Sequence, residues 1–321
     1  MIYKQENSVG ILEAPFELKL GAEAFTVYEY YNKILDPVCS LPYRFKNTIE
    51  KLDTLNHIKG KHSFYKVNQN FRNISFQQKV LVGFTGSLDS IYQVLQLKEI
   101  GYEVKLFYLN YMTMLGEKRL NDVIAFSKQL NIPLVTCNLI LKDKLFVENS
   151  FINLFLYSLM LDCCQSHDIY YISSGDALDI MRKTNTFSNL PDVTQIFIDE
   201  LYMSISFDFI KAEKISKIDK LKKLKKYNLS SSFTDCINTD KFLKINKNKL
   251  QMQYNILLPE NNCGICRKCA FYNLLSHYYL NKKFTAEYID FCWKQIITDN
   301  NYTIFNENIP LAIRIKNLSY C

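Results

Sequence analysis

In the middle of the chain, short continuous runs of apolar residues alternate with stretches in which apolar residues recur at helical spacing. The runs predict strands, and the stretches between them predict helices. Five short runs of apolar, β-branched and aromatic residues predict buried strands. They cover residues 79–84, 105–111, 134–140, 168–173 and 205–209. Between them, apolar residues recur at helical spacing and predict helices over residues 88–100, 117–130 and 147–165. A further helix is predicted over the lysine-rich residues 211–226, with most of its lysines on the solvated face.

This order of elements predicts the fold class. Continuous apolar strands separated by helices are typical of a parallel sheet that is covered on both faces. Right-handed crossovers then give a doubly wound α/β fold with a five-stranded parallel sheet. We expect it over residues 77–229, between an N-terminal appendage of unknown role (residues 1–76) and a C-terminal segment packed on it (residues 230–321). Within that last segment, the lysine- and asparagine-rich residues 241–249 predict a loop.

Length and charge narrow the function classes. The 321 residues suffice for one main domain, and 39 basic against 32 acidic residues suit an anionic ligand without requiring nucleic acid. The first twenty residues lack the basic start and apolar run of a signal peptide. The longest apolar stretch, residues 151–161, has about half the length needed to cross a bilayer and predicts a core helix. We therefore expect a cytoplasmic protein with no membrane contact.

A candidate phosphate-binding turn joins the first predicted strand to the first predicted helix. Its residues are Phe84, Thr85, Gly86, Ser87, Leu88, Asp89 and Ser90. The helix directs free backbone N–H groups and the positive end of its dipole at this turn, so an anion is favoured there. Gly86 permits close backbone approach, the three hydroxyl residues can donate hydrogen bonds, and Asp89 can cap the helix or hold Mg²⁺. No lysine follows as in a Walker loop, which disfavours kinase or GTPase chemistry.

An ordinary strand-to-helix turn with a serine or aspartate cap is the alternative explanation of these residues. The position of the turn favours ligand binding, because open α/β sheets bind ligands at the carboxyl ends of their strands, near a switch in strand order. Gly175 and Asp176 follow the fourth predicted strand and would lie at the same edge of the sheet, although they equally suit a turn.

Three cysteines within seven residues, Cys263, Cys266 and Cys269, predict a metal site. A tetrahedral Zn²⁺ ion needs a fourth ligand, for which we choose Cys236, with His277 in reserve. A ferredoxin-type iron–sulfur cluster is disfavoured, because Asn273 stands where a fourth cysteine would be. The alternative is three free, partly buried thiols. A closed four-cysteine site would be structural and would not activate water.

The turn resembles the Ser-Gly-Gly-x-Asp-Ser signature of PP-loop ATP pyrophosphatases, which cleave ATP between the α and β phosphates and adenylate a substrate. Gly86, Asp89 and Ser90 match, whereas Thr85 replaces the first serine and Ser87 the second glycine. Together with the cysteine cluster, the turn is similar to the 7-cyano-7-deazaguanine synthase (QueC) family, whose fold is adenine nucleotide α-hydrolase-like. Residues 187–192 and 211–213 are similar to the family's Phe-Ser-Gly-Tyr-Pro-Asp and Lys-Ala-Glu stretches.

The resemblance implies a reaction and a set of roles. The carboxylate of 7-carboxy-7-deazaguanine would be adenylated and passed to ammonia, giving an amide and then a nitrile. ATP, Mg²⁺ and Zn²⁺ would be the cofactors, and the protein a homodimer. Asp89 would act at the phosphates, Lys211 would neutralise phosphate or carboxylate charge, and Asp192 would contact the base or a catalytic water. Without the resemblance, Lys211 is part of a solvated helix face and Asp192 a first-turn acid.

Two departures from the family keep other functions open. Residues 112–114 and 150–153 lack the arginines of the family's Gly-Gln-Arg-His and Pro-Gly-Arg-Asn runs, which suggests an altered reaction, an altered substrate or a partner that supplies charge. QueC-like proteins occur in anti-phage systems such as Qat and some CBASS operons, where the adenylate would be passed to the amine of a protein partner. The competing hypotheses are a PP-loop enzyme that modifies tRNA and a non-catalytic nucleotide-binding subunit.

Overall fold

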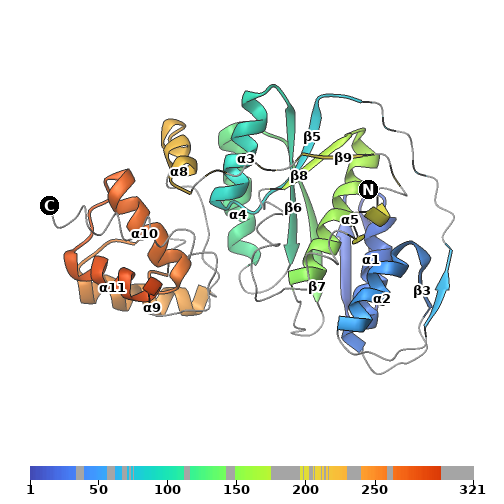
Figure 1. Ribbon diagram of the computed structural model, residues 1–321, viewed down its shortest axis with the longest axis horizontal. Helices are drawn as coiled ribbons and strands as arrows, with labels where there is room; N and C mark the ends of the chain where they lie inside the picture. Colours follow the sequence, from blue (N-terminus) through green and yellow to red (C-terminus); the bar gives the residue numbers. More distant parts are fainter. Residues whose placement is uncertain are drawn as a thin grey trace.

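A twisted sheet with helices on both faces forms the centre of the chain (Figure 1). The computed structural model describes residues 1–33, 40–55, 62–66, 71, 74, 76–111, 116–141, 149–174, 196–197, 199–201, 205, 207–210, 212, 215, 217–229, 240–258 and 263–297.

The predicted five-stranded parallel sheet is confirmed. Its strands are β5 (Lys79–Gly83), β6 (Glu103–Tyr111), β7 (Leu134–Leu141), β8 (Tyr171–Ser174) and β9 (Asp208–Ile210). They lie in the order β7-β6-β5-β8-β9, and each neighbouring pair is parallel. The chain moves outward from β5 through β6 to β7 and then returns to the other side of β5. The strand order therefore reverses at β5 and β8, and the carboxyl ends of these two strands form the switch point.

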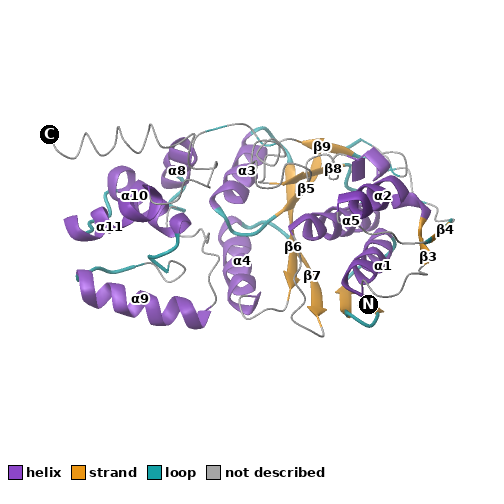
Figure 2. Ribbon diagram, turned by 60° about the horizontal axis from the view of Figure 1, so that its bottom comes forward, coloured by secondary structure: helices purple, strands orange, loops and turns teal. Residues whose placement is uncertain are grey.

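Helices cover the two faces of this sheet as the apolar pattern requires. Figure 2 shows α3 (Leu88–Glu99) and α4 (Gly116–Leu130) on one side of the strands and α5 (Asn149–His167) on the other. Successive residues of β5 serve different faces: Val80 and Val82 belong to the apolar cluster of α3 and α4, and Leu81 to that of α5. Among the described residues, no helix combines the length and the apolar character that a membrane crossing needs.

The N-terminal residues extend the sheet. Strands β1 (Tyr3–Glu6) and β2 (Gly10–Ala14) form an antiparallel hairpin, and β2 pairs antiparallel with β7, so the whole sheet has seven strands. Gly10 permits this contact, because a Cβ atom there would lie 2.5 Å from the carbonyl oxygen of Ile140. Helix α1 (Leu20–Lys33) then packs on α5. The N-terminal segment, whose place the sequence does not show, is thus partly built into the sheet.

A smaller unit follows α1. Strands β3 (Ser40–Pro42) and β4 (Ser63–Tyr65) pair in parallel, and the 3-10 turn η1 (Tyr43–Phe45) and helix α2 (Lys46–Leu55) lie between them in the chain. The start of α2 is capped from far along the sequence: Glu200 accepts hydrogen bonds from the backbone nitrogens of Asn47 and Thr48 at 2.7 and 3.3 Å. This contact joins the smaller unit to the chain that leads into β9.

Four helices make up the described C-terminal part: α8 (Lys217–Lys226), α9 (Asp240–Tyr254), α10 (Arg267–Leu280) and α11 (Ala286–Ile297). Helix α8 lies between α3 and α10 and contacts both (Figure 1). The apolar cluster of α3 and α4 continues through Ile218, Leu221 and Leu224 of α8 into α10 and α11. A single continuous core therefore joins the sheet to the cysteine-containing segment.

One element was predicted wrongly. Residues 241–249, expected as a loop, belong to α9. Their lysine and asparagine content hides apolar positions at helical spacing, because Leu243, Leu250 and Tyr254 recur seven and four residues apart. Leu250 is buried and makes α9 part of the core.

Candidate functional site

The turn between β5 and α3 has the geometry of a capped helix start at the end of the central strand. Gly86 adopts a φ of 70°, which residues with a side chain rarely adopt. Ser87 is the N-cap, and its Oγ accepts a hydrogen bond from the backbone nitrogen of Ser90 at 3.3 Å. The hydroxyl of Ser90 in turn donates to the carbonyl oxygen of Ser87 at 3.1 Å. The extra side chain at Ser87 thus points at the first turn of α3 and closes it.

The remaining residues of the turn divide between core and surface. Phe84 and Leu88 are buried, and the backbone nitrogen of Phe84 donates to the carbonyl oxygen of Phe107 in β6 at 2.8 Å. Thr85, by contrast, is exposed at the carboxyl edge of the sheet. The two apolar residues anchor the turn, and the residues between them remain next to the strand ends where a ligand would bind.

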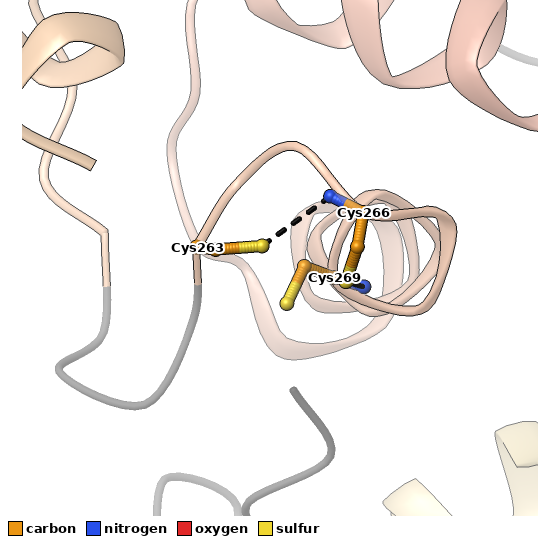
Figure 3. Close-up of side chains that lie close together, drawn as sticks. All are labelled: Cys263, Cys266 and Cys269. Carbon is orange, nitrogen blue, oxygen red and sulfur yellow. Dashed lines mark hydrogen bonds between the residues drawn. The ribbon is translucent and has the colours of Figure 1, made fainter. Parts of the chain in front are cut away.

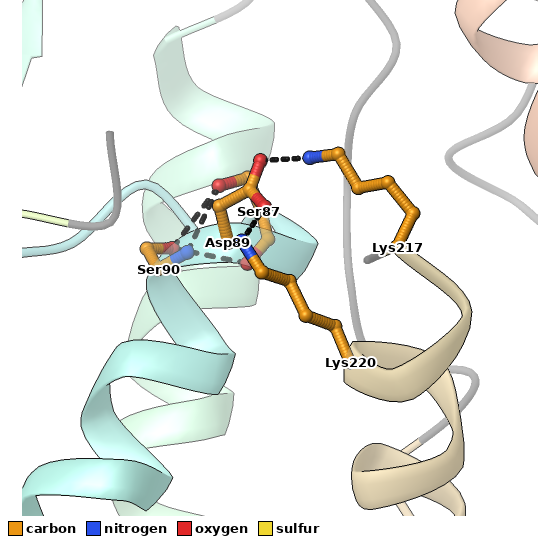
Figure 4. A network of polar contacts seen from close by, with 5 residues as sticks. All are labelled: Ser87, Asp89, Ser90, Lys217 and Lys220. Carbon is orange, nitrogen blue, oxygen red and sulfur yellow. Dashed lines mark hydrogen bonds and ion pairs between the residues drawn. The ribbon is translucent and has the colours of Figure 1, made fainter. Parts of the chain in front are cut away.

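Asp89, in the first turn of α3, lies between two lysines of α8 (Figure 4). Its Oδ1 binds the ammonium of Lys220 at 2.6 Å, and its Oδ2 binds that of Lys217. Burial alone would raise the pKa of Asp89, but the two ammonium groups outweigh it and hold that pKa below its ordinary value. Asp89 is therefore ionised at neutral pH, and the three residues carry a net charge of +1.

A row of polar contacts continues along the two helices. Lys223 binds Gln96 Oε1 at 2.6 Å and also pairs with Glu99, to which the hydroxyl of Tyr227 donates. Asp89 and Lys217 lie at the starts of α3 and α8, and Glu99 and Lys223 lie toward their ends, so the helices run side by side in the same direction. The positive ends of both helix dipoles therefore meet beside Asp89.

Sequence reasoning missed the role of these lysines. It assigned most lysines of residues 211–226 to a solvated face, but those at 217, 220 and 223 point at α3. Their spacing of three residues is the signal that could have been used, since residues three apart share one side of a helix. Only the lysines at 222, 225 and 226 of the described helix are exposed as expected.

A buried hydrogen-bond chain fixes α3 above the switch point. Gln93 Nε2 donates to Ser173 Oγ of β8 at 2.9 Å, and Ser173 Oγ donates to the carbonyl oxygen of Ile210 at the end of β9 at 2.7 Å. Sequence reasoning did not select Gln93, because a glutamine within a helix carries no signal of a buried partner. These two hydrogen bonds hold the first turns of α3 in a fixed position over the strand ends.

Several predicted site residues lie outside the described part of the chain. They are Gly175, Asp176, Asp192, Lys211 and Cys236. The roles predicted for them remain predictions. The described site is made by the turn of residues 84–90 and by Lys217 and Lys220.

The three cysteines of the C-terminal segment lie together (Figure 3). The sulfur atoms of Cys263, Cys266 and Cys269 are all within 4.8 Å of one another. Four thiolates around one Zn²⁺ ion, each about 2.3 Å from the metal, lie about 3.8 Å apart, so the spacing fits a single ion. Cys266 is also the N-cap of α10, where its sulfur accepts from the backbone nitrogen of Cys269 at 3.5 Å.

Residues of α10 and α11 fix the loop between Cys263 and Cys266 through hydrogen bonds. Asn273 donates to the hydroxyl of Tyr288 at 2.7 Å, and that hydroxyl donates to the carbonyl oxygen of Gly264 at 3.1 Å. Gly264 has a φ of 74°, and a Cβ atom there would lie 2.6 Å from Leu258 Cδ1. Only glycine fits this place, so the packing fixes the curve of the loop that brings Cys263 to the other two cysteines.

The reserve ligand His277 is excluded by the structure. It lies eight residues after Cys269 on the same helix, a rise of about 12 Å. Its Nδ1 is instead 2.9 Å from the carbonyl oxygen of Lys282, two residues beyond the end of α10. The described residues supply three ligands, and Cys236 remains the predicted fourth.

Comparison with known proteins assigns no family. No family model matches the chain, and no curated protein matches it in sequence. One solved structure to which it is similar is the U34-tRNA thiolase NcsA from Methanococcus maripaludis with its [4Fe-4S] cluster. The match has a TM-score of 0.37 and 16% identity, and covers 73% of this chain and 80% of that chain. A likeness of this degree gives this chain neither an activity nor a ligand.

Proposed function

We propose that this chain is an ATP-dependent enzyme of the PP-loop type, which binds ATP by its phosphates at residues 84–90 and activates its substrate as an adenylate. The observation that carries the proposal is the placement of Asp89. It lies at the start of α3, at the carboxyl end of the central strand, between Lys217 and Lys220. An ordinary capped turn needs none of these charges, whereas a bound pyrophosphate group needs cations and helix N-termini.

The chemistry suits this arrangement. In adenylation, a substrate oxygen attacks the α-phosphorus of ATP, the bond to the β-phosphate oxygen breaks, and pyrophosphate leaves. The positive ends of α3 and α8 and the nearby lysines stabilise the negative charge that grows on pyrophosphate. An ionised Asp89 beside the hydroxyls of Ser87 and Ser90 also offers the oxygen ligands that Mg²⁺ prefers. When bound, Mg²⁺ would neutralise phosphate charge.

For the substrate, the carboxylate of a 7-deazaguanine is the first candidate. It is supported by the sequence resemblance to the 7-cyano-7-deazaguanine synthase family, which includes the turn, the cysteine cluster and residues 187–192. The acceptor would be ammonia or, in a defence-system relative, the amine of a protein partner. A homodimer is part of the same proposal.

A tRNA base is the second candidate substrate. The last turn of α8 exposes Lys225 and Lys226, and exposed basic residues of this kind favour a phosphate backbone. Adenylation of a carbonyl oxygen on a base would use the same ATP chemistry as adenylation of a carboxylate.

The three cysteines and Cys236 would hold one structural Zn²⁺ ion. The all-thiolate donor set, the close sulfur spacing and the fixed turn at Gly264 support this assignment. The ion would hold the start of α10 in place and take no part in the reaction.

One set of incubations tests the activity and separates the two substrates. The full chain is incubated with ATP and Mg²⁺, and with 7-carboxy-7-deazaguanine with and without ammonia, or with tRNA, and AMP and pyrophosphate are measured by mass spectrometry. Adenylate retained without ammonia would support the deazaguanine substrate, and AMP release only with tRNA would support the second candidate. ATP that stays intact in every mixture contradicts the proposed function. Asp89→Ala is the inactive control.

A further inference from the structure

Both oxygens of the Asp89 carboxylate are occupied by cations. Lys220 takes Oδ1, and Lys217 takes Oδ2. We call Asp89, Lys217 and Lys220 the ion triplet. A divalent cation that binds this carboxylate would lie beside two ammonium groups of like charge and would repel them, and an anion that binds these lysines must compete with the carboxylate. Metal binding and anion binding at the ion triplet are linked for this reason.

Lys220 makes the linkage strong. The residue is only 5% exposed, and its ammonium also lies 5.6 Å from the centre of the Tyr92 ring. A buried ammonium group that loses its carboxylate without gaining another anion is strongly destabilising. Lys217 has a more exposed side chain, at 21%, and tolerates such a loss better. Lys223, three residues after Lys220 on the side of α8 that contacts α3, keeps Glu99 and Gln96 as partners whatever happens at Asp89.

We propose that the ion triplet is a magnesium-gated phosphate site: when a divalent cation binds Asp89, Lys217 and Lys220 exchange the carboxylate for phosphate oxygens. This inference rests on the proposed ATP binding and deepens it, because it names Lys220 as a phosphate ligand. It also gives the site a preference for magnesium-bound polyphosphate. In the absence of the metal, Asp89 competes with the phosphate for the lysines and repels it.

Binding measurements on the full chain test the exchange without any turnover. Calorimetry with pyrophosphate and with ATP is performed with and without Mg²⁺ for the wild type, Asp89→Asn, Lys220→Gln and Lys217→Gln. We expect the wild type to bind pyrophosphate about tenfold more weakly without Mg²⁺. Asp89→Asn frees both lysines, so it binds metal-free pyrophosphate about tenfold more tightly than the wild type does and gains little from Mg²⁺.

The lysine variants complete the design. Lys220→Gln and Lys217→Gln each lose about tenfold in affinity for magnesium pyrophosphate. Lys222→Gln, on the same helix but with a side chain 63% exposed, is the matched control and keeps wild-type affinity. Circular dichroism shows whether each variant is folded. If Lys220→Gln does not fold, the affinity of Lys217→Gln tests the proposal, because Lys217 is the more exposed of the two lysines.

The possible failures are distinct. If the wild type binds neither ATP nor pyrophosphate in the presence of Mg²⁺, both the proposed function and this inference are wrong. If the wild type binds them but Asp89→Asn shows no gain in metal-free affinity, the exchange is overturned while ATP binding stands. Wild-type affinity in both lysine variants would likewise overturn it.

Discussion

Asp162 in α5 and Leu20 at the start of α1 are joined by a hydrogen bond of 3.0 Å, although 142 positions separate them in the chain. The backbone nitrogens of Lys19 and Gly21 donate to the other carboxylate oxygen at 2.9 and 2.8 Å. The buried carboxylate thus caps α1 in place of a local serine or aspartate. It also fastens the N-terminal segment to the α/β domain.

Replacing Asp162 by alanine should destabilise the protein. The change leaves three backbone N–H groups without their acceptor, and we expect the free energy of unfolding to fall by about 2–4 kcal/mol. Asp162→Asn is the matched control, because it keeps one acceptor oxygen and should lose less. Urea denaturation measures both. Wild-type stability in Asp162→Ala would show that the cap contributes nothing.

The same carboxyl group should make stability depend on pH. Burial raises the pKa of Asp162 from an ordinary value of 3.8 to about 7, although the three N–H donors act in the opposite direction. Between these values the folded protein holds a proton that the unfolded chain has released, so the contribution of Asp162 to stability falls as pH rises from about 4 to about 7. Asp162→Asn lacks this proton. The stability of the wild type relative to Asp162→Asn, measured at pH 5 and pH 8, should be greater at pH 5, and a difference that is equal or larger at pH 8 contradicts the prediction.

The backbone conformation at Gly86, and not the space around it, should determine which residues this position accepts. A Cβ atom there would meet nothing closer than Val123 Cγ2 at 3.8 Å, so alanine has space, but a φ of 70° is strained for it. Gly86→Ala should therefore lower the free energy of unfolding by about 1–2 kcal/mol. Asparagine tolerates this conformation, so Gly86→Asn should lose less. Thermal unfolding compares the two variants, and an alanine variant as stable as the wild type would mean that the turn adopts another conformation.

Metal content should depend on the cysteines of the proposed zinc site and not on buried thiols elsewhere. The purified wild type should contain one zinc ion per chain, and Cys269→Ser should lose most of it, because three thiolate and one hydroxyl ligands bind Zn²⁺ more weakly than four thiolates. Cys292 is a buried thiol outside the cluster, so Cys292→Ala should retain the ion. Elemental mass spectrometry measures the zinc content per chain of the wild type and of both variants. Iron together with sulfide in the wild type would point to a cluster instead.

The sequence was informative wherever burial alone determined the structure. Most residues in the strands of the parallel sheet are apolar, and β5 begins at the predicted residue Lys79 and β7 at Leu134. Strand β9 begins three residues later than predicted, because the apolar run that starts at Ile205 leads into it. The capped turn of residues 84–90 and the cysteine cluster were also predictable, since each depends on neighbours in the chain.

The missed features depend on partners that are distant in sequence. Strand β1 has four exposed residues and no apolar signal, and it exists because β2 pairs with β7. Lys217 and Lys220 are the same residue type as the solvated Lys222, and only the position of α8 against α3 separates them. Asp162 lies within an apolar helix with no local hint that α1 begins beside it. In each case the interaction belongs to the packing of elements and not to a local pattern.

The distant cap of α1 has a consequence during protein synthesis. A ribosome adds roughly 5–20 residues per second, so Asp162 is made about 7–28 s after Leu20, from which 142 positions separate it. Over that interval the start of α1 has no acceptor for its backbone N–H groups, and the same holds for α2 until Glu200 is made. The nascent N-terminal segment therefore depends on water or on a chaperone, and it reaches its final form only after β5, β6 and β7 have been translated.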